Sequence, residues 1–197
     1  MTELYNLDHL TELVKLSEIY ERQPDNYEIA WPNWASYHNN RMTLKEESFE
    51  DDYHMNINVV VKQLHAAINK NKIPKDFSVL DIFCGTGGTL ARIKREFPEC
   101  HAYGIDVKID EFQTAEVMKS SSIHVYKVPI QLMYQSTLSF DVITSFNSYR
   151  AFKRNLKIER ANDNNKIILN QLETWIAHSS KFFIWEEGIQ ESRSLIK

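Results

Sequence analysis

Residues 79–90 of this chain read Val-Leu-Asp-Ile-Phe-Cys-Gly-Thr-Gly-Gly-Thr-Leu, and this stretch decides the fold. Residues 78–83 have the β-branched and aromatic side chains of a buried strand. The strand contains a carboxylate, Asp81, and runs directly into a turn whose glycines permit tight bending and the close approach of a ligand. This arrangement predicts a nucleotide-like cofactor at the turn.

The residues after the turn complete a strand, helix and strand unit. A helix is expected from Thr89 until Pro98 stops it. A second strand, residues 101–105, ends at Asp106, about 20 residues beyond the glycines. In a doubly wound fold, an acid at this place accepts hydrogen bonds from ribose hydroxyls. Asp106 is therefore the candidate ribose ligand.

Asp81 distinguishes between two classes of cofactor. A carboxylate beside the glycine turn would repel the pyrophosphate of a dinucleotide. The same carboxylate would attract the ammonium and sulfonium of S-adenosylmethionine. The third position of the dinucleotide fingerprint is Leu90, where that fingerprint has glycine or alanine. Both observations favour S-adenosylmethionine over NAD(P).

The motif resembles that of the class I S-adenosylmethionine-dependent methyltransferases, whose first motif reads acid-x-x-x-Gly-x-Gly. The resemblance covers roughly residues 62–187. In that family the glycine loop holds the methionine part of the cofactor, and the acid after the second strand holds the ribose. The resemblance implies these cofactor-binding residues: Asp81, Phe83, Gly85, Thr86, Gly87, Asp106 and Val107. Many relatives have an adenine-binding acid after the third strand, and Tyr126 to Val128 provide none there.

The expected fold class is α/β, a Rossmann-like doubly wound and mostly parallel sheet with strand order 3-2-1-4-5. The five strands are predicted at residues 78–83, 101–105, 123–130, 140–146 and 181–185. Few residues follow the fifth strand, so the terminal hairpin of the family is expected to be missing, or to be completed by a partner. The fifth strand would then be an exposed edge through which a homo-oligomer could form.

Residues 1–56 are predicted to be a helical and aromatic cap, and residues 57–197 to be one compact cofactor-binding domain. Residues 4–20 have helical spacing of apolar side chains, as do residues 57–68. The aromatic side chains of residues 27–41 include Trp31, Trp34 and Tyr37. They could cover the cofactor as a lid or anchor the segment to the core.

Asn147 and Tyr149 follow the fourth strand and are the predicted catalytic residues beside the transferred methyl group, with ordinary turn residues as the alternative. This loop has neither the Asn/Asp-Pro-Pro-aromatic signature of amino methyltransferases acting on bases or glutamine nor the Pro-Cys of cytosine-C5 enzymes. An oxygen or nitrogen atom of a small-molecule or glycan-type acceptor is therefore favoured. The next segment has four cations that would suit a phosphate-bearing acceptor or form a solvated surface: Arg150, Lys153, Arg154 and Lys157.

Composition excludes several classes of protein. A chain of 197 residues with 43% hydrophobic residues fits one domain, and a net charge of -4 gives no overall attraction to nucleic acid or to anionic membranes. No leader or membrane-spanning segment is evident, so a cytoplasmic location is expected. The two cysteines form no C-x-x-C pair and the seven histidines are scattered, so no metal site is predicted.

The leading hypothesis is an S-adenosylmethionine-dependent methyltransferase. A non-catalytic relative that keeps the cofactor turn and acts as a regulatory or scaffolding subunit is the second hypothesis. An NAD(P)-dependent oxidoreductase is the third, and Asp81 and Leu90 disfavour it. All three hypotheses place a ligand at the same glycine turn.

Overall fold

A six-stranded sheet forms the centre of the molecule. The computed structural model describes residues 2–24, 47–85, 87–107, 118–119, 122–145, 149, 163–185 and 188–195. The strands are β1 (Ser78–Ile82), β2 (His101–Asp106), β3 (His124–Lys127), β4 (Phe140–Ser145), β5 (Ser180–Trp185) and β6 (Gly188–Glu191). Their order is β3-β2-β1-β4-β5-β6, with the first five strands parallel and β6 antiparallel to β5. The predicted Rossmann-like α/β fold is confirmed.

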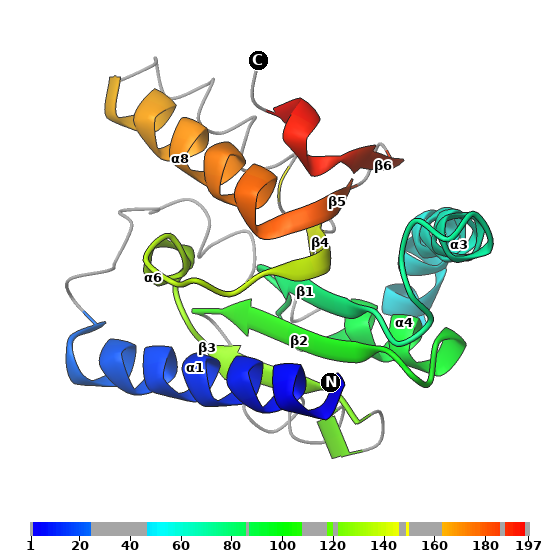
Figure 1. Ribbon diagram of the computed structural model, residues 1–197, viewed down its shortest axis with the longest axis horizontal. Coiled ribbons are helices and arrows are strands. Elements are labelled where there is room, and N and C mark those ends of the chain that lie inside the picture. Colours follow the sequence, from blue (N-terminus) through cyan, green and yellow to red (C-terminus); the bar gives the residue numbers. More distant parts are fainter. Residues whose placement is uncertain are drawn as a thin grey trace.

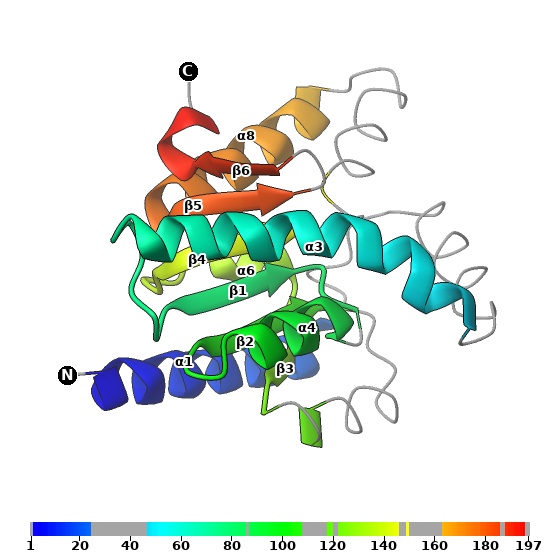
Figure 2. The ribbon, with the colours of Figure 1, turned by 90° about the vertical axis from the view of Figure 1, so that its right-hand side faces the viewer.

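Helices cover both faces of the sheet (Figures 1 and 2). One face packs against α3 (Glu47–Asn69) and α4 (Gly88–Glu96), and the other against α1 (Thr2–Arg22), α6 (Ile130–Met133) and α8 (Asp163–Ser179). A 3-10 turn, η2 (Ser192–Leu195), follows β6. The strands are apolar on both faces: Val79 belongs to the core under α3 and α4, whereas Leu80 and Ile82 belong to the core on the other side.

The third strand is shorter than predicted. It ends at Lys127, whereas the sequence analysis extended it to residue 130. Pro129 is the N-cap of α6, with extended backbone angles of φ -70° and ψ 143°. Proline has no N–H for a ladder hydrogen bond and is well suited to a helix start, so the chain turns into α6 here.

The prediction that the fifth strand is an exposed edge is wrong. β5 pairs with β4 on one side and with β6 on the other, with Phe182 opposite Glu191 and Ile184 opposite Ile189. The order predicted for the first five strands holds, and β6 adds an antiparallel sixth. The gap between the two strands is only Glu186 and Glu187, so the hairpin is a local feature of the C-terminal region.

Helix α1 belongs to the main core rather than to a separate cap. Leu13, Leu16 and Tyr20 are buried in the same apolar cluster as the side chains of β1, β2 and β4 on that face of the sheet. His9 is also buried, and its Nε2 lies 2.8 Å from the carbonyl oxygen of Ser139, just before β4. Helix α1 therefore forms part of the layer that covers the sheet.

The domain boundary predicted at residue 56 falls inside α3, which begins ten residues before the predicted start at residue 57. The aromatic side chains Trp31, Trp34 and Tyr37 lie outside the described residues, as do the four cations of residues 150–157. Within the described part of the chain, no helix has both the length and the apolar character needed to cross a membrane.

Candidate cofactor site

The glycine turn leaves β1 through backbone conformations that most residues avoid. Phe83, Gly85 and Gly87 have positive φ angles of 60°, 55° and 87°. Gly87 is also the N-cap of α4, and its carbonyl oxygen accepts the N–H of Ala91 at 2.9 Å. Glycine adopts these angles without a steric penalty, whereas Phe83 does so under strain, a feature often found next to ligands.

Asp106 is bound directly to the turn. The N–H of Gly85 donates to Oδ2 of Asp106 at 2.9 Å, and the N–H of Cys84 donates to the carbonyl oxygen of Ile105 at 3.1 Å. Asp106 is the last residue of β2 and is 8% exposed. The structure thus brings together the predicted ribose ligand and the predicted methionine-binding loop, 21 residues apart in the chain.

Gly104 is a structural requirement of this site that sequence reasoning missed. A Cβ atom at Gly104 would lie 2.7 Å from Sγ of Cys84 and 2.9 Å from Cδ1 of Leu90. Any larger residue would force the Cys84 side chain in the turn and the Leu90 side chain in the first turn of α4 to move. The signal was present in the sequence, because a glycine inside a strand often marks the close approach of another segment.

Asp81 is a buried carboxylate on the strand that leads into the turn. It is 2% exposed, and the Thr144 hydroxyl donates to its Oδ1 at 2.7 Å. Burial raises the pKa of Asp81 to about 7; repulsion from Asp106 acts in the same direction, and the hydrogen bond from Thr144 opposes it. In the described part of the chain, no cation pairs with Asp81.

The outer side of the turn is open to a ligand. A Cβ atom built on Gly85 or Gly88 would have no atom within 4 Å. This free space lies next to two buried carboxylates, Asp81 and Asp106, at the carboxyl ends of parallel strands. The chemistry fits a ligand with cationic groups and hydroxyls, because an uncompensated buried carboxylate is stabilised by a positive charge.

The remaining predicted cofactor contacts are only partly described. Val107 follows Asp106 and is 36% exposed, so its side chain is accessible beside the turn. Thr86 lies outside the described residues, as does Asn147. Their predicted roles stay predictions.

Tyr149 is buried in the core on the α8 side of the sheet. Its ring packs edge-on against Phe183 and Trp185, and its hydroxyl donates to Oε1 of Glu173 at 2.5 Å. It is 0% exposed, and burial raises its pKa well above the usual range. These contacts give Tyr149 a packing role, and its predicted catalytic role stays a prediction.

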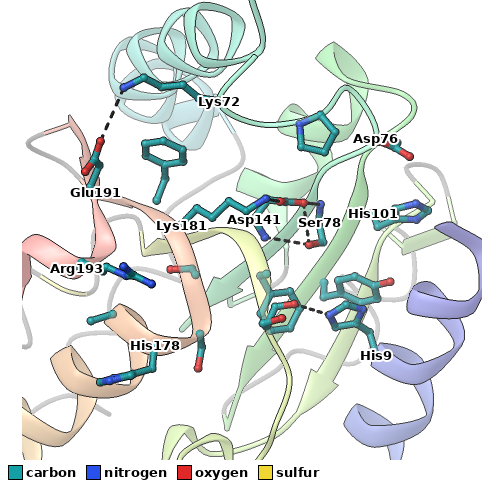
Figure 3. A pocket seen from close by; sticks show the side chains of 18 residues that line it. His9, Lys72, Asp76, Ser78, His101, Asp141, His178, Lys181, Glu191 and Arg193 are labelled. Atoms are coloured by element: carbon teal, nitrogen blue, oxygen red, sulfur yellow. Dashed lines mark hydrogen bonds and ion pairs between the residues drawn. The ribbon is translucent and has the colours of Figure 1, made fainter. Parts of the chain in front are cut away.

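A pocket of 780 Å³ lies at the opposite edge of the sheet (Figure 3). Its lining includes the first residue of four strands: Ser78, His101, Phe140 and Ser180. It therefore lies at the amino ends of the parallel strands, whereas ligands of such sheets bind at the carboxyl ends. We assign the cofactor to the glycine turn because the turn and both buried carboxylates are at that edge.

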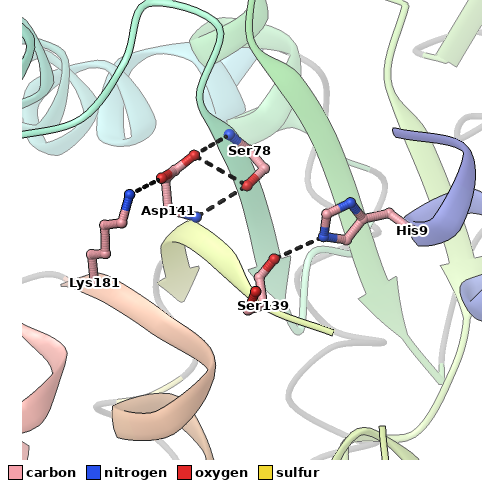
Figure 4. A network of polar contacts seen from close by, with 5 residues as sticks. All are labelled: His9, Ser78, Ser139, Asp141 and Lys181. Carbon is pink, nitrogen blue, oxygen red and sulfur yellow. Dashed lines mark hydrogen bonds and ion pairs between the residues drawn. The ribbon is translucent and has the colours of Figure 1, made fainter. Parts of the chain in front are cut away.

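A polar network crosses this second edge (Figure 4). Oδ2 of Asp141 accepts the N–H of Ser78 at 3.0 Å, and Oδ1 lies 2.7 Å from Nζ of Lys181. The N–H of Asp141 in turn donates to Oγ of Ser78 at 3.0 Å. These contacts join the starts of β1, β4 and β5, and both oxygens of the Asp141 carboxylate have a partner within the chain.

Comparison with known proteins identifies the family. A family model described as a methyltransferase domain matches residues 73–188, which include the glycine turn and both buried carboxylates. The chain belongs to the methyltransferase-domain family. This membership confirms the methyltransferase family predicted from the sequence. No match was found among curated protein sequences.

Solved methyltransferase structures resemble this family member at low sequence identity. The bifunctional kinase-methyltransferase WbdD is 14% identical with a TM-score of 0.51, over 66% of this chain and 27% of WbdD. The plantazolicin methyltransferase BpumL is 18% identical with a TM-score of 0.47, over 94% of this chain and 60% of that protein. A methyltransferase from Clostridium acetobutylicum is 14% identical with a TM-score of 0.49, over 76% of this chain and 56% of that protein. The WbdD likeness supports the fold alone, and the chain spans less than two thirds of all three proteins.

Proposed function

We propose that this methyltransferase-family chain binds S-adenosylmethionine at the glycine turn and transfers its methyl group to an oxygen or nitrogen atom of a small-molecule or glycan-type acceptor. The observation that carries the proposal is the environment of Asp81. Its carboxylate is buried beside an open turn, and no cation compensates it within the described residues. A ligand with positive charge would relieve this cost, which NAD(P) cannot do through its pyrophosphate.

Each described residue of the site has a proposed role. Asp81 attracts the cationic methionine part of the cofactor, and the glycine turn lets that part approach the backbone. Asp106 accepts hydrogen bonds from the ribose while it holds the N–H of Gly85. Further cofactor contacts are proposed for Phe83, Thr86, Gly87 and Val107.

Methyl transfer requires the protein mainly to position the acceptor atom relative to the methyl group. When bound, S-adenosylmethionine supplies an electrophilic methyl group on a sulfonium. The chain has to hold an acceptor atom in line with that methyl group and exclude water, and both effects accelerate displacement without an obligatory general base. The residues that follow β4, with Asn147 and Tyr149 among them, are the proposed neighbours of the acceptor.

The acceptor class rests on the sequence after β4. Residues 146–149 read Phe-Asn-Ser-Tyr, and they have no proline to form the signatures of base, glutamine or cytosine-C5 methyltransferases. The net charge of -4 also disfavours nucleic acid as the acceptor. These observations support a small-molecule or glycan-type acceptor.

Calorimetric titration with S-adenosylmethionine and S-adenosylhomocysteine tests the cofactor site. We expect saturable binding by the wild type and a loss of affinity of about 30-fold or more in Asp106→Ala, since a charged hydrogen-bond acceptor is removed. Asp8→Ala is the matched control, because it removes an exposed carboxylate on α1. Equal affinities in Asp106→Ala and wild type would contradict the site assignment.

Two further measurements separate the competing functions. Titration with NAD(P) should show no binding, and saturable binding would favour an oxidoreductase. Incubation of the protein with S-adenosylmethionine and pooled small-molecule and glycan acceptors should release S-adenosylhomocysteine. Tight cofactor binding without any transfer to such acceptors would instead favour a non-catalytic cofactor-binding subunit.

A further inference from the structure

Thr144, on β4, makes the hydrogen bond that holds the buried carboxylate of the cofactor site. We propose that Thr144 is a positioning residue for S-adenosylmethionine binding, because its hydroxyl holds the buried Asp81 carboxylate in one orientation beside the glycine turn. This inference rests on the proposed function and adds to it a residue that does not itself touch the cofactor. Thr144 is 63 residues from Asp81 in the chain and outside the glycine motif.

The sheet register sets this contact. Asp81 and Thr144 are direct neighbours in the parallel pairing of β1 with β4. Two residues earlier in the same register, Val79 lies opposite Val142, and both belong to the core under α3 and α4. Since side chains alternate along a strand, Asp81 and Thr144 also share that face. The pairing of two central strands therefore fixes the separation of the two side chains.

The hydrogen bond between Thr144 and Asp81 is buried, which limits the conformations of both side chains. Thr144 is 0% exposed and Asp81 is 2% exposed, and the distance between Oγ1 and Oδ1 is 2.7 Å. Threonine is β-branched, so its χ1 angle has few alternatives in a packed strand. Its hydroxyl is thus held toward the carboxylate, and Asp81 is kept in one orientation at the entrance of the turn.

The described titratable groups around Asp81 do not compensate its charge. Asp106 on β2 repels it, and the pKa of the half-buried Cys84 thiol in the turn is itself raised well above its usual value, with Asp106 and Asp81 among the causes. No cation from the described residues of α3, α4 or the neighbouring strands contributes. The Thr144 hydrogen bond opposes burial and Asp106 and lowers the pKa of Asp81, which stands at about 7 as the net result of the three. Without this bond, more of Asp81 would be protonated at neutral pH.

The consequence is a pH-dependent affinity. A protonated Asp81 does not attract a cationic cofactor, so binding below pH 7 must first release a proton. The affinity for S-adenosylmethionine should therefore rise with pH through about 7 and level off above it. Loss of the Thr144 hydroxyl raises the pKa of Asp81, so the same rise should occur at higher pH.

Thr144→Val is the decisive variant, because it keeps the branched shape and removes only the donor. Calorimetry with S-adenosylmethionine from about pH 6 to 9 should show about fivefold weaker binding than wild type at pH 7, with the midpoint of the pH dependence about one unit higher. Much of the affinity should return near pH 9. Thr144→Ser restores the donor and should recover the wild-type affinity and midpoint.

Ser145→Ala is the matched control. Ser145 is the next residue of β4, is also 0% exposed, and its hydroxyl has no hydrogen-bond partner among the residues that the structure describes. By strand alternation it faces the opposite side of the sheet. Its loss should leave both the affinity and the pH midpoint unchanged, so an effect confined to Thr144 would support the proposal.

Several outcomes would overturn the inference. An unshifted pH midpoint in Thr144→Val would show that the hydroxyl does not control Asp81, and an equal loss of affinity at every pH would indicate a structural role alone. If Thr144→Val does not fold by circular dichroism, Thr144→Ala must show the upward shift instead. Failure of the wild type to bind at any pH would overturn the proposed function itself, which distinguishes the two failures.

Discussion

Asp141 and Asp81 lie on neighbouring strands, and their carboxylates have different kinds of partner. Asp141 is the second residue of β4, at the amino edge of the sheet, where Lys181 pairs with one carboxylate oxygen at 2.7 Å and Ser78 donates to the other (Figure 4). Asp81 lies near the carboxyl edge of β1, where Thr144 is its hydrogen-bond donor. Lys181 neutralises the first carboxylate, whereas the described residues provide no cation for the second.

This difference indicates which edge is built for a ligand. A buried charge without a partner destabilises a protein, so it persists where something outside the chain compensates it. The amino edge has a described pocket, but there Lys181 pairs with Asp141 and Lys72 lies 3.9 Å from Glu191. The presence of a pocket is therefore a weaker guide here than the buried Asp81 carboxylate, with which no described cation pairs.

The largest expected effect is on the free energy of unfolding, which removal of the charge should raise at Asp81 and lower at Asp141. In the folded protein the pKa of Asp81 is raised from 3.8 to about 7, so the folded state holds this proton more tightly than the unfolded state. The contribution of Asp81 to the free energy of unfolding is therefore most favourable below about pH 4, and it decreases as the pH rises toward 7. Asp81→Asn, which carries no charge, should thus be more stable than wild type by about 4 kcal/mol at pH 8 and equal to it near pH 4.

Urea unfolding of the cofactor-free protein at both pH values measures this effect. Asp141→Asn is the matched variant and should lose about 1 kcal/mol at pH 8, because Lys181 and Ser78 lose a charged acceptor. A loss of stability in Asp81→Asn at pH 8 would break the comparison, since it would mean that the charge of Asp81 is compensated within the chain.

The same two variants should differ in cofactor affinity. Asp81→Asn should bind S-adenosylmethionine about 20-fold more weakly than wild type at pH 8, which corresponds to about 1.8 kcal/mol, because the attraction to its cationic groups is lost. Asp141→Asn should stay within about twofold of wild type, because Asp141 lies at the other edge. Isothermal titration calorimetry gives both values, and equal losses in the two variants would contradict the assignment of the ligand edge.

The smallest effect is expected for Lys181→Ala. The Lys181 side chain is 60% exposed, and solvent screens its ion pair with Asp141. We expect a loss of less than about 1 kcal/mol in unfolding free energy that shrinks further in concentrated salt. A larger and salt-independent loss, measured by the same urea unfolding, would mean that Asp141 depends on this cation as strongly as on Ser78.

Local sequence signals predicted the cofactor edge well. The glycine turn, Asp81 and Asp106 occupy a continuous unit of strand, helix and strand, and each is recognised from its position at a strand end. The third strand was predicted too long, although Pro129 was already visible, because its apolar neighbours concealed the start of α6. The contribution of α1 to the main core was missed, because an amphipathic helix does not indicate which surface it will cover.

Contacts between distant segments could not be predicted in this way. The hydroxyl that holds Asp81 comes from a threonine that resembles any other strand residue in the sequence, and Tyr149 gave no sign that Glu173 would bind its hydroxyl. The hairpin of β5 and β6 was missed because its four-residue second strand was short and followed two charged residues.

The sequence by itself located the first five strands along the chain, the glycine turn and the two carboxylates next to it, because these depend on neighbouring residues and on strand periodicity. The order of those strands in the sheet was predicted from the family resemblance. Only the tertiary structure decided that Asp81 is buried without a compensating cation in the described chain, while Asp141 is paired. Burial and pairing depend on which strands become neighbours and in which register, and those are properties of the assembled sheet.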